Sequence, residues 1–304
     1  MNLNFDIGNV TVTEFGVGRD DGNGQSFVAV PVDASVQAAI REMVQATWEA
    51  MQRDDDEPAK YEPSEKHGGI EYLYLPLNDD LAVSVRELHQ AANLDVNAHA
   101  LAEPSEVFCY FARLRDGQQQ HLTALRRATQ FKGILKSKGR LVRILDDSLQ
   151  MIEDTVFKLD RDFDLLIDSA NVHILRPSGF EFAGKLQQAI LDAVPENIQA
   201  IGTDLSFVEF ASLEQYAIKH PRAARYLASI RGQGEMSNID RTALMRLCKQ
   251  TGVEVTESNG KLAVDTGHEM GFLEVLDRRR YELELVKGQP ERFKAASRRK
   301  IEDQ

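Results

Sequence analysis

The sequence has only two cysteines and lacks any long apolar run. Cys109 and Cys248 lie far apart and form no CxxC pair, which excludes a disulfide scaffold and fits a reducing compartment. The apolar stretches are far shorter than the roughly 20 residues that span a bilayer, so we expect no membrane span. The first ten residues have no basic region followed by an apolar core, so we expect no secretory signal and a cytoplasmic location.

The sequence also lacks the short motifs that carry common chemistry. There is no HExxH, Walker A or GxSxG motif, and the seven histidines are not spaced as zinc ligands are. Asp160, Asp162, Asp164 and Asp168 cluster around an expected hairpin, where each suits a turn or loop position. We therefore predict no catalytic residue, no metal and no cofactor, and the sequence leans against an enzyme without deciding the question.

Alternating apolar and polar residues predict strands through most of the first half of the chain, which has an ordinary globular composition. Apolar residues at helical spacing predict a long helix over 34–52, with Asp33 or Ser35 as its N-cap, and a short helix over 81–92. The expected strands are 10–15, 27–32, 70–75, 107–114, 121–125, 141–145, 155–159, 163–168 and 172–176.

After residue 177 the pattern becomes mostly helical. Ser178 with Glu181, and Thr266 with Glu269, have the spacing of capping boxes, in which a hydroxyl and a carboxylate each satisfy a backbone N–H at a helix start. The other expected elements are helices over 205–219, 221–231 and 238–251, a hairpin turning at Asn259-Gly260, and a strand over 280–286.

These patterns predict an α+β fold with a strand-rich N-terminal half. The C-terminal half is expected to be mostly helical and closed by a hairpin and a final strand. The expected domains are a strand-rich lobe at 1–176, which holds a basic tract, and a helical lobe at 177–304 with the hairpin, the strand and a basic tail.

Charge is strongly segregated along the chain, whose net charge is −12. Residues 117–145 contain seven Lys or Arg and no acid, and residues 278–300 contain nine bases against three acids. These two segments carry +13, so the rest of the chain carries −25. An anionic partner would offset the repulsion within the basic tract, and phosphate contacts contribute most of non-specific DNA affinity.

We therefore predict that the basic tract binds DNA. Phe131 lies inside the tract, where it could stack on an unpaired base, although a core position suits it better. The main competing interpretation is a solvated basic face that pairs with the protein's own acids, and a third is contact with an anionic membrane surface. The predicted DNA contacts are Arg126, Arg127, Lys132, Lys136, Lys138, Arg140 and Arg143, and the secondary set is Arg222, Arg225, Arg298, Arg299 and Lys300.

Two runs of sequence resemble a bacterial family: FKLDRDFDLLIDSANVHILRPSGFEFAGKL at 157–186 and FLEVLDRRRYELELV at 272–286. In this family an apolar hairpin leads into a helix, and a helix and strand close the chain. The family is KwaB of the Kiwa anti-phage defence system, and the resemblance covers about residues 105–290. It implies a cytoplasmic, homodimeric DNA-binding effector that blocks phage DNA replication or late transcription. It also implies recruitment to the inner face of the membrane by a small membrane-embedded KwaA-like partner.

Two other functions stay open at this stage. One is a metal-dependent nuclease whose site is assembled from scattered carboxylates such as Asp162, Asp164 and Glu181. The other is an interaction subunit of a membrane complex that does not bind DNA. The salt dependence of DNA binding distinguishes an effector that binds DNA from such a subunit, because only the former loses affinity steeply as salt rises.

Overall fold

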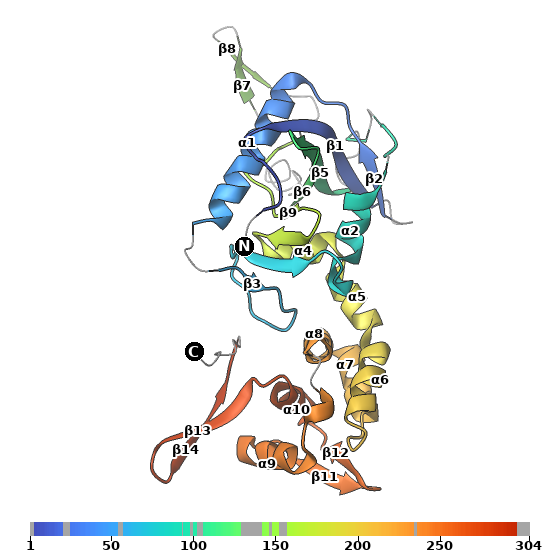
Figure 1. The fold of residues 1–304 in the computed structure, drawn as a ribbon, viewed down its shortest axis with the longest axis vertical. Coiled ribbons are helices and arrows are strands. Elements are labelled where there is room, and N and C mark those ends of the chain that lie inside the picture. Colours follow the sequence, from blue (N-terminus) through green and yellow to red (C-terminus); the bar gives the residue numbers. More distant parts are fainter. Residues whose placement is uncertain are drawn as a thin grey trace. The chain divides into compact units, whose positions relative to one another are not determined.

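The computed structural model describes residues 3–20, 25–53, 57–92, 94–97, 100–101, 106–128, 142–145, 148–151, 157–233 and 236–296. The chain forms two compact units. The first unit comprises Met1–Tyr61 and Gly68–Lys185, and the second comprises Glu62–His67 and Leu186–Gln304. The short segment Glu62–His67 therefore leaves the strand-rich unit and is part of the helical one. Figure 1 shows the elements of both units, each of which is described by itself below.

An eight-stranded sheet organises the first unit, in the order β2-β1-β5-β6-β9-β10-β4-β3. All neighbouring strands are antiparallel except β3 and β4. The strands are β1 (Val10–Asp20), β2 (Gln25–Ala29), β3 (Ala59–Lys60), β4 (Leu73–Pro76), β5 (Val107–Asp116), β6 (His121–Arg127), β9 (Leu165–Ile167) and β10 (Asn171–Ile174). A separate hairpin pairs β7 (Val142–Leu145) with β8 (Ser148–Met151).

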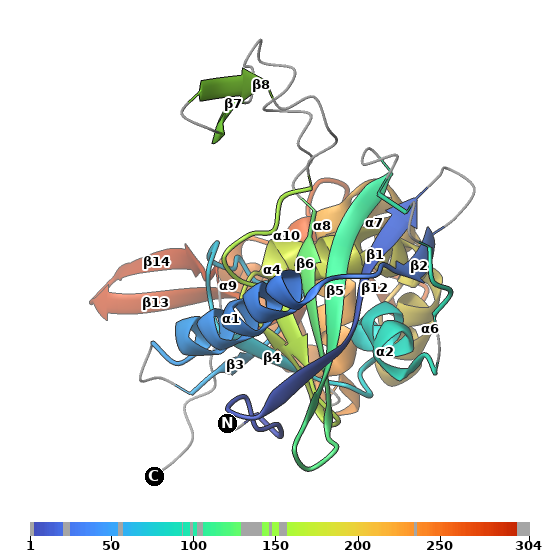
Figure 2. The same ribbon diagram turned by 90° about the horizontal axis from the view of Figure 1, so that it is seen from above.

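Helix α1 (Ala34–Met51) crosses one face of this sheet (Figure 2). Its side chains Ile40, Met43 and Val44 are buried with alternate residues of β5 and β6, including Ala112 and Ala124. Alternation along the strands directs the intervening residues of β5 and β6 to the opposite face. The 3₁₀ turn η1 (Asp80–Ala82) and the helices α2 (Val83–Gln90) and α4 (Pro177–Ala183) complete this unit.

Helix α8 (Pro221–Gly232) packs against four other helices of the second unit, α5, α6, α7 and α10, with Ala224, Tyr226, Leu227 and Ile230 buried. The elements around it are α5 (Leu186–Asp192), α6 (Val194–Asp204), α7 (Ala211–Lys219), η2 (Met236–Asn238), α9 (Arg241–Thr251) and α10 (Glu269–Leu276). Two hairpins complete the unit: β11 (Val255–Ser258) with β12 (Lys261–Val264), and β13 (Arg280–Val286) with β14 (Gln289–Lys294).

A buried arginine anchors the segment Glu62–His67 inside the second unit. The guanidinium of Arg279 is fully buried and donates from Nε to Asp277 Oδ2 at 2.6 Å. It also donates from Nη2 to Ser64 Oγ at 2.9 Å and to Glu65 Oε1 at 3.3 Å. Its remaining contacts include the ring of Tyr226, whose centroid lies 5.7 Å from Cζ. These contacts hold a loop from the N-terminal half of the sequence against the end of α10.

The α+β class with strands first and helices second is confirmed. Sequence signals that act through local backbone geometry, such as helix caps and tight turns, also predicted where elements begin and end. Asp33 caps α1 by accepting from the Val36 N–H at 2.9 Å, Pro221 begins α8, and Gly252 ends α9 with φ +69°. Both residues of the Asn259-Gly260 turn have positive φ, as a type I′ turn requires. Both cysteines are free and buried.

Both predicted capping boxes are wrong. Helix α4 begins at Pro177, whose fixed φ suits the first helical position, so Ser178 lies inside the first turn and no side chain caps the helix. Glu181 instead accepts a hydrogen bond from the Tyr61 hydroxyl. Helix α10 begins at Glu269 itself, which accepts from the Gly267 N–H, and His268 is the N-cap position without a side-chain cap.

Two strand predictions also differ from the structure. Residues 157–159 form no strand, and the rest of the predicted strand 155–159 lies outside the described residues. The chain after 280–286 was expected to be a polar basic tail, but it turns at Gly288 and returns as β14. Charged side chains at 291, 292 and 294 concealed this strand, because the hairpin is exposed and does not need an apolar pattern.

Candidate nucleic-acid interface

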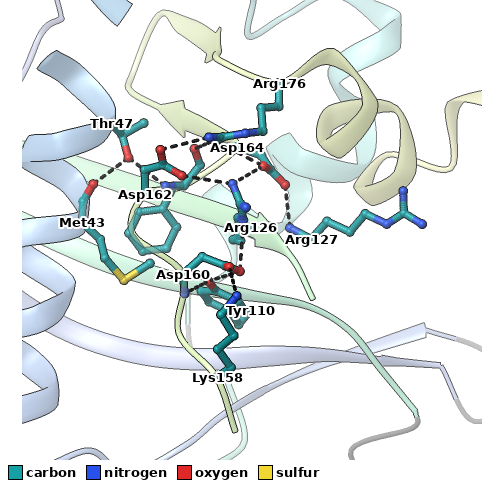
Figure 3. Close-up of polar contacts among 11 residues, drawn as sticks. Met43, Thr47, Tyr110, Arg126, Arg127, Lys158, Asp160, Asp162, Asp164 and Arg176 are labelled. Atoms are coloured by element: carbon teal, nitrogen blue, oxygen red, sulfur yellow. Dashed lines mark hydrogen bonds and ion pairs between the residues drawn. The ribbon is translucent and has the colours of Figure 1, made fainter. Parts of the chain in front are cut away.

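The predicted basic tract begins at the end of β6, where Arg126 lies among three aspartates (Figure 3). Its Nη1 lies 2.8 Å from Asp164 Oδ1 and 3.2 Å from Asp162 Oδ1, and its Nε lies 3.4 Å from Asp160 Oδ2. The side chain of Arg126 is only 16% exposed. These contacts match the competing interpretation for this one residue, because its charge is balanced by the protein's own acids.

Further contacts hold the aspartates in place around Arg126. Arg176 pairs with Asp162 at 3.0 Å, and Lys158 pairs with Asp160 at 2.9 Å. The backbone N–H of Asp160 donates to the Tyr110 hydroxyl at 2.9 Å, and Tyr110 lies directly opposite Arg126 in the sheet. Acidic and basic side chains therefore alternate in a network at the edge of the sheet where β5 begins and β6 ends.

The same segment is fastened to α1 by a buried hydroxyl. Thr47 Oγ1 accepts from the Phe163 N–H at 2.8 Å and donates to the Met43 carbonyl at 2.6 Å. Phe163 itself is fully buried in the core. Asp160 and Asp162 lie in a loop, as the sequence predicted, and the contact with Thr47 makes this acid-rich segment part of the packed structure.

Burial and charge act in opposite directions on the pKa values of this cluster. Burial raises the pKa of Asp164, and the attraction of Arg126 and Arg176 offsets that rise only in part. Burial would lower the pKa of Arg126, but the neighbouring carboxylates, Asp164 first, raise it overall. The pKa of Asp160 is lowered because Lys158 and Arg126 outweigh its burial. Arg126 thus stays charged, and its charge is balanced by the neighbouring aspartates.

The aspartates bind guanidinium groups in positions where a metal-dependent nuclease would bind cations. Asp162 and Asp164 each contact both Arg126 and Arg176. Across the described part of the chain, no group of three or more His, Cys, Asp or Glu residues is arranged to hold a metal ion. The two arginines neutralise the charge that would otherwise attract a divalent cation.

Arg127 has a different environment from its neighbour, because alternation along β6 places it on the opposite face. It is exposed, and its Cζ lies 3.9 Å from the centroid of the Phe182 ring on α4. Only its backbone N–H joins the acidic cluster, by donating to Asp164 Oδ2 at 2.8 Å. Phe182 is 39% exposed, so an arginine and an aromatic ring are stacked at the surface where the tract begins.

Most of the predicted tract lies outside the described residues. Arg143 lies in β7, where its backbone pairs with Gln150. The other members of the tract, which lie outside the described residues, are Phe131, Lys132, Lys136, Lys138 and Arg140.

The secondary set is divided among different environments. Arg222 is exposed, with its Cζ 6.0 Å from the Tyr226 ring centroid. Arg225 donates to the Pro63 carbonyl at 3.1 Å, so it helps hold the segment Glu62–His67. Arg298, Arg299 and Lys300 lie outside the described residues.

A buried polar chain in the first unit was missed at the sequence level. His173 Nε2 contacts Asp168 Oδ2 at 3.1 Å, and His173 Nδ1 contacts the Tyr72 hydroxyl at 3.0 Å. Burial, with the nearby Asp168 charge, raises the pKa of Tyr72 to about 12, so this hydroxyl is not an activated nucleophile. The spacing of Asp168 and His173 across a predicted hairpin was the available signal, because both side chains share one face of β9 and β10.

Comparison with known proteins identifies the family. In the described part of the chain, no helix is both long and apolar enough to cross a bilayer. No curated protein and no solved structure matches the sequence. One family does match: the model described as Kiwa protein KwaB-like aligns with residues 105–285, which is more than half of the chain. This region includes β5, β6, the Arg126 cluster and most of the helical unit, and the chain belongs to the KwaB-like family of Kiwa proteins.

Proposed function

We propose that this protein is a DNA-binding effector of a Kiwa-type antiviral defence system. It blocks phage DNA replication or transcription by occupying DNA and does not cleave it. Family membership supports the role in a Kiwa system. The observation that carries the DNA-binding step is the acid-free basic tract at 117–145, which is unusual in a chain with a net charge of −12.

Two neighbouring arginines at the start of the tract have different partners, which supports different roles for them. Arg126 is paired with aspartates and anchors the end of β6, while Arg127 is exposed and stacked on Phe182. A guanidinium on an aromatic ring can contact a phosphate through its free edge, and the pair can receive an unstacked base. We propose that Arg127 and the tract residues after it contact DNA, and that Arg126 positions them.

The test is a DNA-binding titration at several salt concentrations with duplex and single-stranded DNA. The variant carries Lys136→Glu, Lys138→Glu and Arg140→Glu, and we expect it to bind all sequences more weakly. The slope of log affinity against log salt should flatten by roughly one unit for each phosphate contact that is lost. The matched control reverses three exposed bases of the second unit, Arg246, Lys249 and Lys261.

A tract variant that binds as the wild type does would refute this proposal. Equal losses in the tract variant and the control would show that only net charge matters. Cleavage of plasmid DNA with Mg²⁺ or Mn²⁺ that persists through repurification, and disappears when Asp162 and Asp164 are both replaced by alanine, would favour a nuclease.

We further propose that the effector is a homodimer in the cytoplasm, recruited to the membrane by a KwaA-like partner of the same system. The hairpin β13–β14 supports a protein partner, because Tyr281, Leu283 and Phe293 share one face of it and are exposed, and Leu285 beyond the register shift is exposed as well. An isolated two-stranded hairpin with an apolar face is marginally stable in water. Light scattering should report twice the 34.1 kDa chain mass for the wild type and the chain mass itself after Leu283→Asp.

A further inference from the structure

A second cluster of positive charge lies at the other end of β5 and β6, away from the basic tract. A pocket of about 590 Å³ opens there on the face of the sheet that carries α2. Arg113 and Arg115 of β5 line it, together with His121 and Thr123, their partners in β6, and His89 near the end of α2. All of these residues belong to the first unit.

The two arginines of this pocket differ in how far their charge is balanced. Arg113 pairs with Glu14 at 3.2 Å and donates to the carbonyls of Leu88 and Ala91, so it closes the C-terminal end of α2. Arg115 contacts two uncharged or basic side chains and no carboxylate, with Nη1 3.1 Å from Gln119 Oε1 and Nη2 3.5 Å from a ring nitrogen of His121. Arg115 has no ion-pair partner in the described residues.

The Nε–H groups of both arginines are buried without an acceptor. Among the described residues only four buried side-chain atoms lack a hydrogen-bond partner, and two of them are the Nε atoms of Arg113 and Arg115. A buried donor without an acceptor is unfavourable, because it has lost its hydrogen bonds to water and gained none in the protein. Two such donors on one strand, both bordering one pocket, indicate that these guanidinium groups have hydrogen-bonding capacity that the fold does not use.

The other titratable groups around the pocket leave its positive charge in place. Burial, and then the nearby charges of Arg113 and His121, lower the pKa of His89 to about 4, so this imidazole is neutral near pH 7. Glu14 is already paired with Arg113. Asp116, close to His121, accepts the backbone N–H groups of Asp6, Gln118 and Gln120, so its carboxylate is satisfied outside the pocket.

From these contacts we propose that this pocket binds a small phosphorylated molecule of about the size of a mononucleotide. Arg115 receives the phosphate, since a guanidinium can donate two parallel hydrogen bonds to phosphate oxygens. The volume lies within the range of small-molecule sites and exceeds what a phosphate ion alone would fill. The remaining lining offers hydrogen-bonding groups at Gln90 and Gln120 and an apolar side chain at Ala92.

The test measures binding to the full-length protein by calorimetry. The probes are adenosine and thymidine 5′-monophosphates, ribose 5-phosphate, inorganic phosphate, and adenosine without phosphate. We expect saturable binding of the phosphorylated probes and none of adenosine, with the nucleotides binding more tightly than inorganic phosphate if the rest of the pocket contributes. Arg115→Gln should weaken the binding at least about tenfold, because a charge-assisted contact is lost.

Arg241→Gln is the matched control, because it removes the same charge from an exposed ion pair with Glu257 in the second unit. Ala92→Phe is a second variant that leaves every charge in place and obstructs the pocket, so it should weaken the nucleotides more than inorganic phosphate. Arg113 is left unchanged, because its contacts with Glu14 and α2 make it necessary for folding. Thermal unfolding of each variant checks that it is folded.

Three outcomes would overturn the proposal: no saturable binding of any phosphorylated probe, undiminished binding by Arg115→Gln, or an equal loss in Arg241→Gln. This pocket does not depend on the proposed DNA binding. The variant of Lys136, Lys138 and Arg140 should therefore keep its nucleotide affinity, and Arg115→Gln should keep its DNA affinity. Nucleotide binding that disappears with the tract variant would place the ligand at the DNA interface and refute the assignment to the pocket.

Discussion

Each unit of the protein contains an arginine held by aspartate, and the two arginines have different consequences. Arg279 in the second unit is fully buried, pairs with the equally buried Asp277 and holds the segment Glu62–His67. Arg126 in the first unit keeps 16% of its side chain exposed, and the next residue, Arg127, faces solvent on the other side of the sheet. Arg279 is therefore part of a buried core, whereas Arg126 lies at the end of a strand where the basic tract begins.

The comparison extends to the two basic segments of the sequence. In 278–300, several bases pair with nearby acids: Arg280 and Lys294 both pair with Glu274, and Arg292 pairs with Glu282. In 117–145, the acids that pair with Arg126 come from a different part of the chain, at 160–164. A run of bases in the sequence therefore does not by itself identify a free positive surface, because the acids that neutralise it can come from any distance along the chain.

Removing the buried charge of the second unit should produce the largest loss of stability. Arg279→Met leaves Asp277 buried without its partner, so we expect the free energy of unfolding to fall by about 3–5 kcal/mol. Urea denaturation measures this loss, and Arg241→Met, at an exposed ion pair, is the control. A loss below about 1 kcal/mol, as for surface pairs, would contradict the comparison between the buried and exposed arginines.

The neighbouring pair Arg126 and Arg127 should separate stability from binding. Arg126→Met leaves three carboxylates close together and should lower the free energy of unfolding by about 2–3 kcal/mol, less than Arg279→Met because the site is partly exposed. Arg127→Met should leave stability within about 0.5 kcal/mol of the wild type, as surface changes do, and weaken DNA binding. Denaturation measures the stability of both variants, and salt titrations measure their DNA binding. Equal effects of the two changes on stability would contradict the assigned roles.

The pair of Asp168 and His173 should give a smaller, pH-dependent effect. Burial would raise the pKa of Asp168, but hydrogen bonds from His173 and the backbone N–H groups of Asn4, Ala170 and Asn171 lower it to about 2. Because the pKa of Asp168 in the folded protein lies below its ordinary value of 3.8, this stabilisation is present above about pH 4 and is lost as the pH falls towards 2.

The resulting contribution is about 2 kcal/mol at neutral pH. Asp168→Asn should be less stable than the wild type by about that amount at pH 7, and the difference should shrink as the pH falls towards 2. Denaturation at a series of pH values measures it, with Asp204→Asn, an exposed acid, as the control. A difference that stays constant with pH would mean that the carboxylate charge has no role at this position.

The sequence predicted the elements whose cause is local. The cap at Asp33, the turn at Asn259-Gly260 and the stop at Gly252 each depend on the backbone geometry of a few neighbouring residues. The capping boxes failed at Ser178 and Thr266 because α4 begins at Pro177 and α10 begins at Glu269, so neither hydroxyl occupies an N-cap position. Residues 157–159, the described part of the predicted strand 155–159, form no strand and lead into the acid-rich segment around Arg126.

The candidate sites, too, have features that the sequence predicts and features that only the tertiary structure decides. Composition and charge order are properties of the sequence, so the acid-free tract at 117–145 and the family of the chain could both be recognised without a structure. Only the tertiary structure decided that Arg126 is neutralised while Arg127 is not, because strand alternation and the return of residues 160–164 place the acids on one face of β6. The turn between β5 and β6 is local and places Arg115 opposite His121, as the sequence predicted, but only the tertiary structure brings Glu14 of β1 and His89 of α2 to the same pocket, because their contacts with these strands are distant in the sequence.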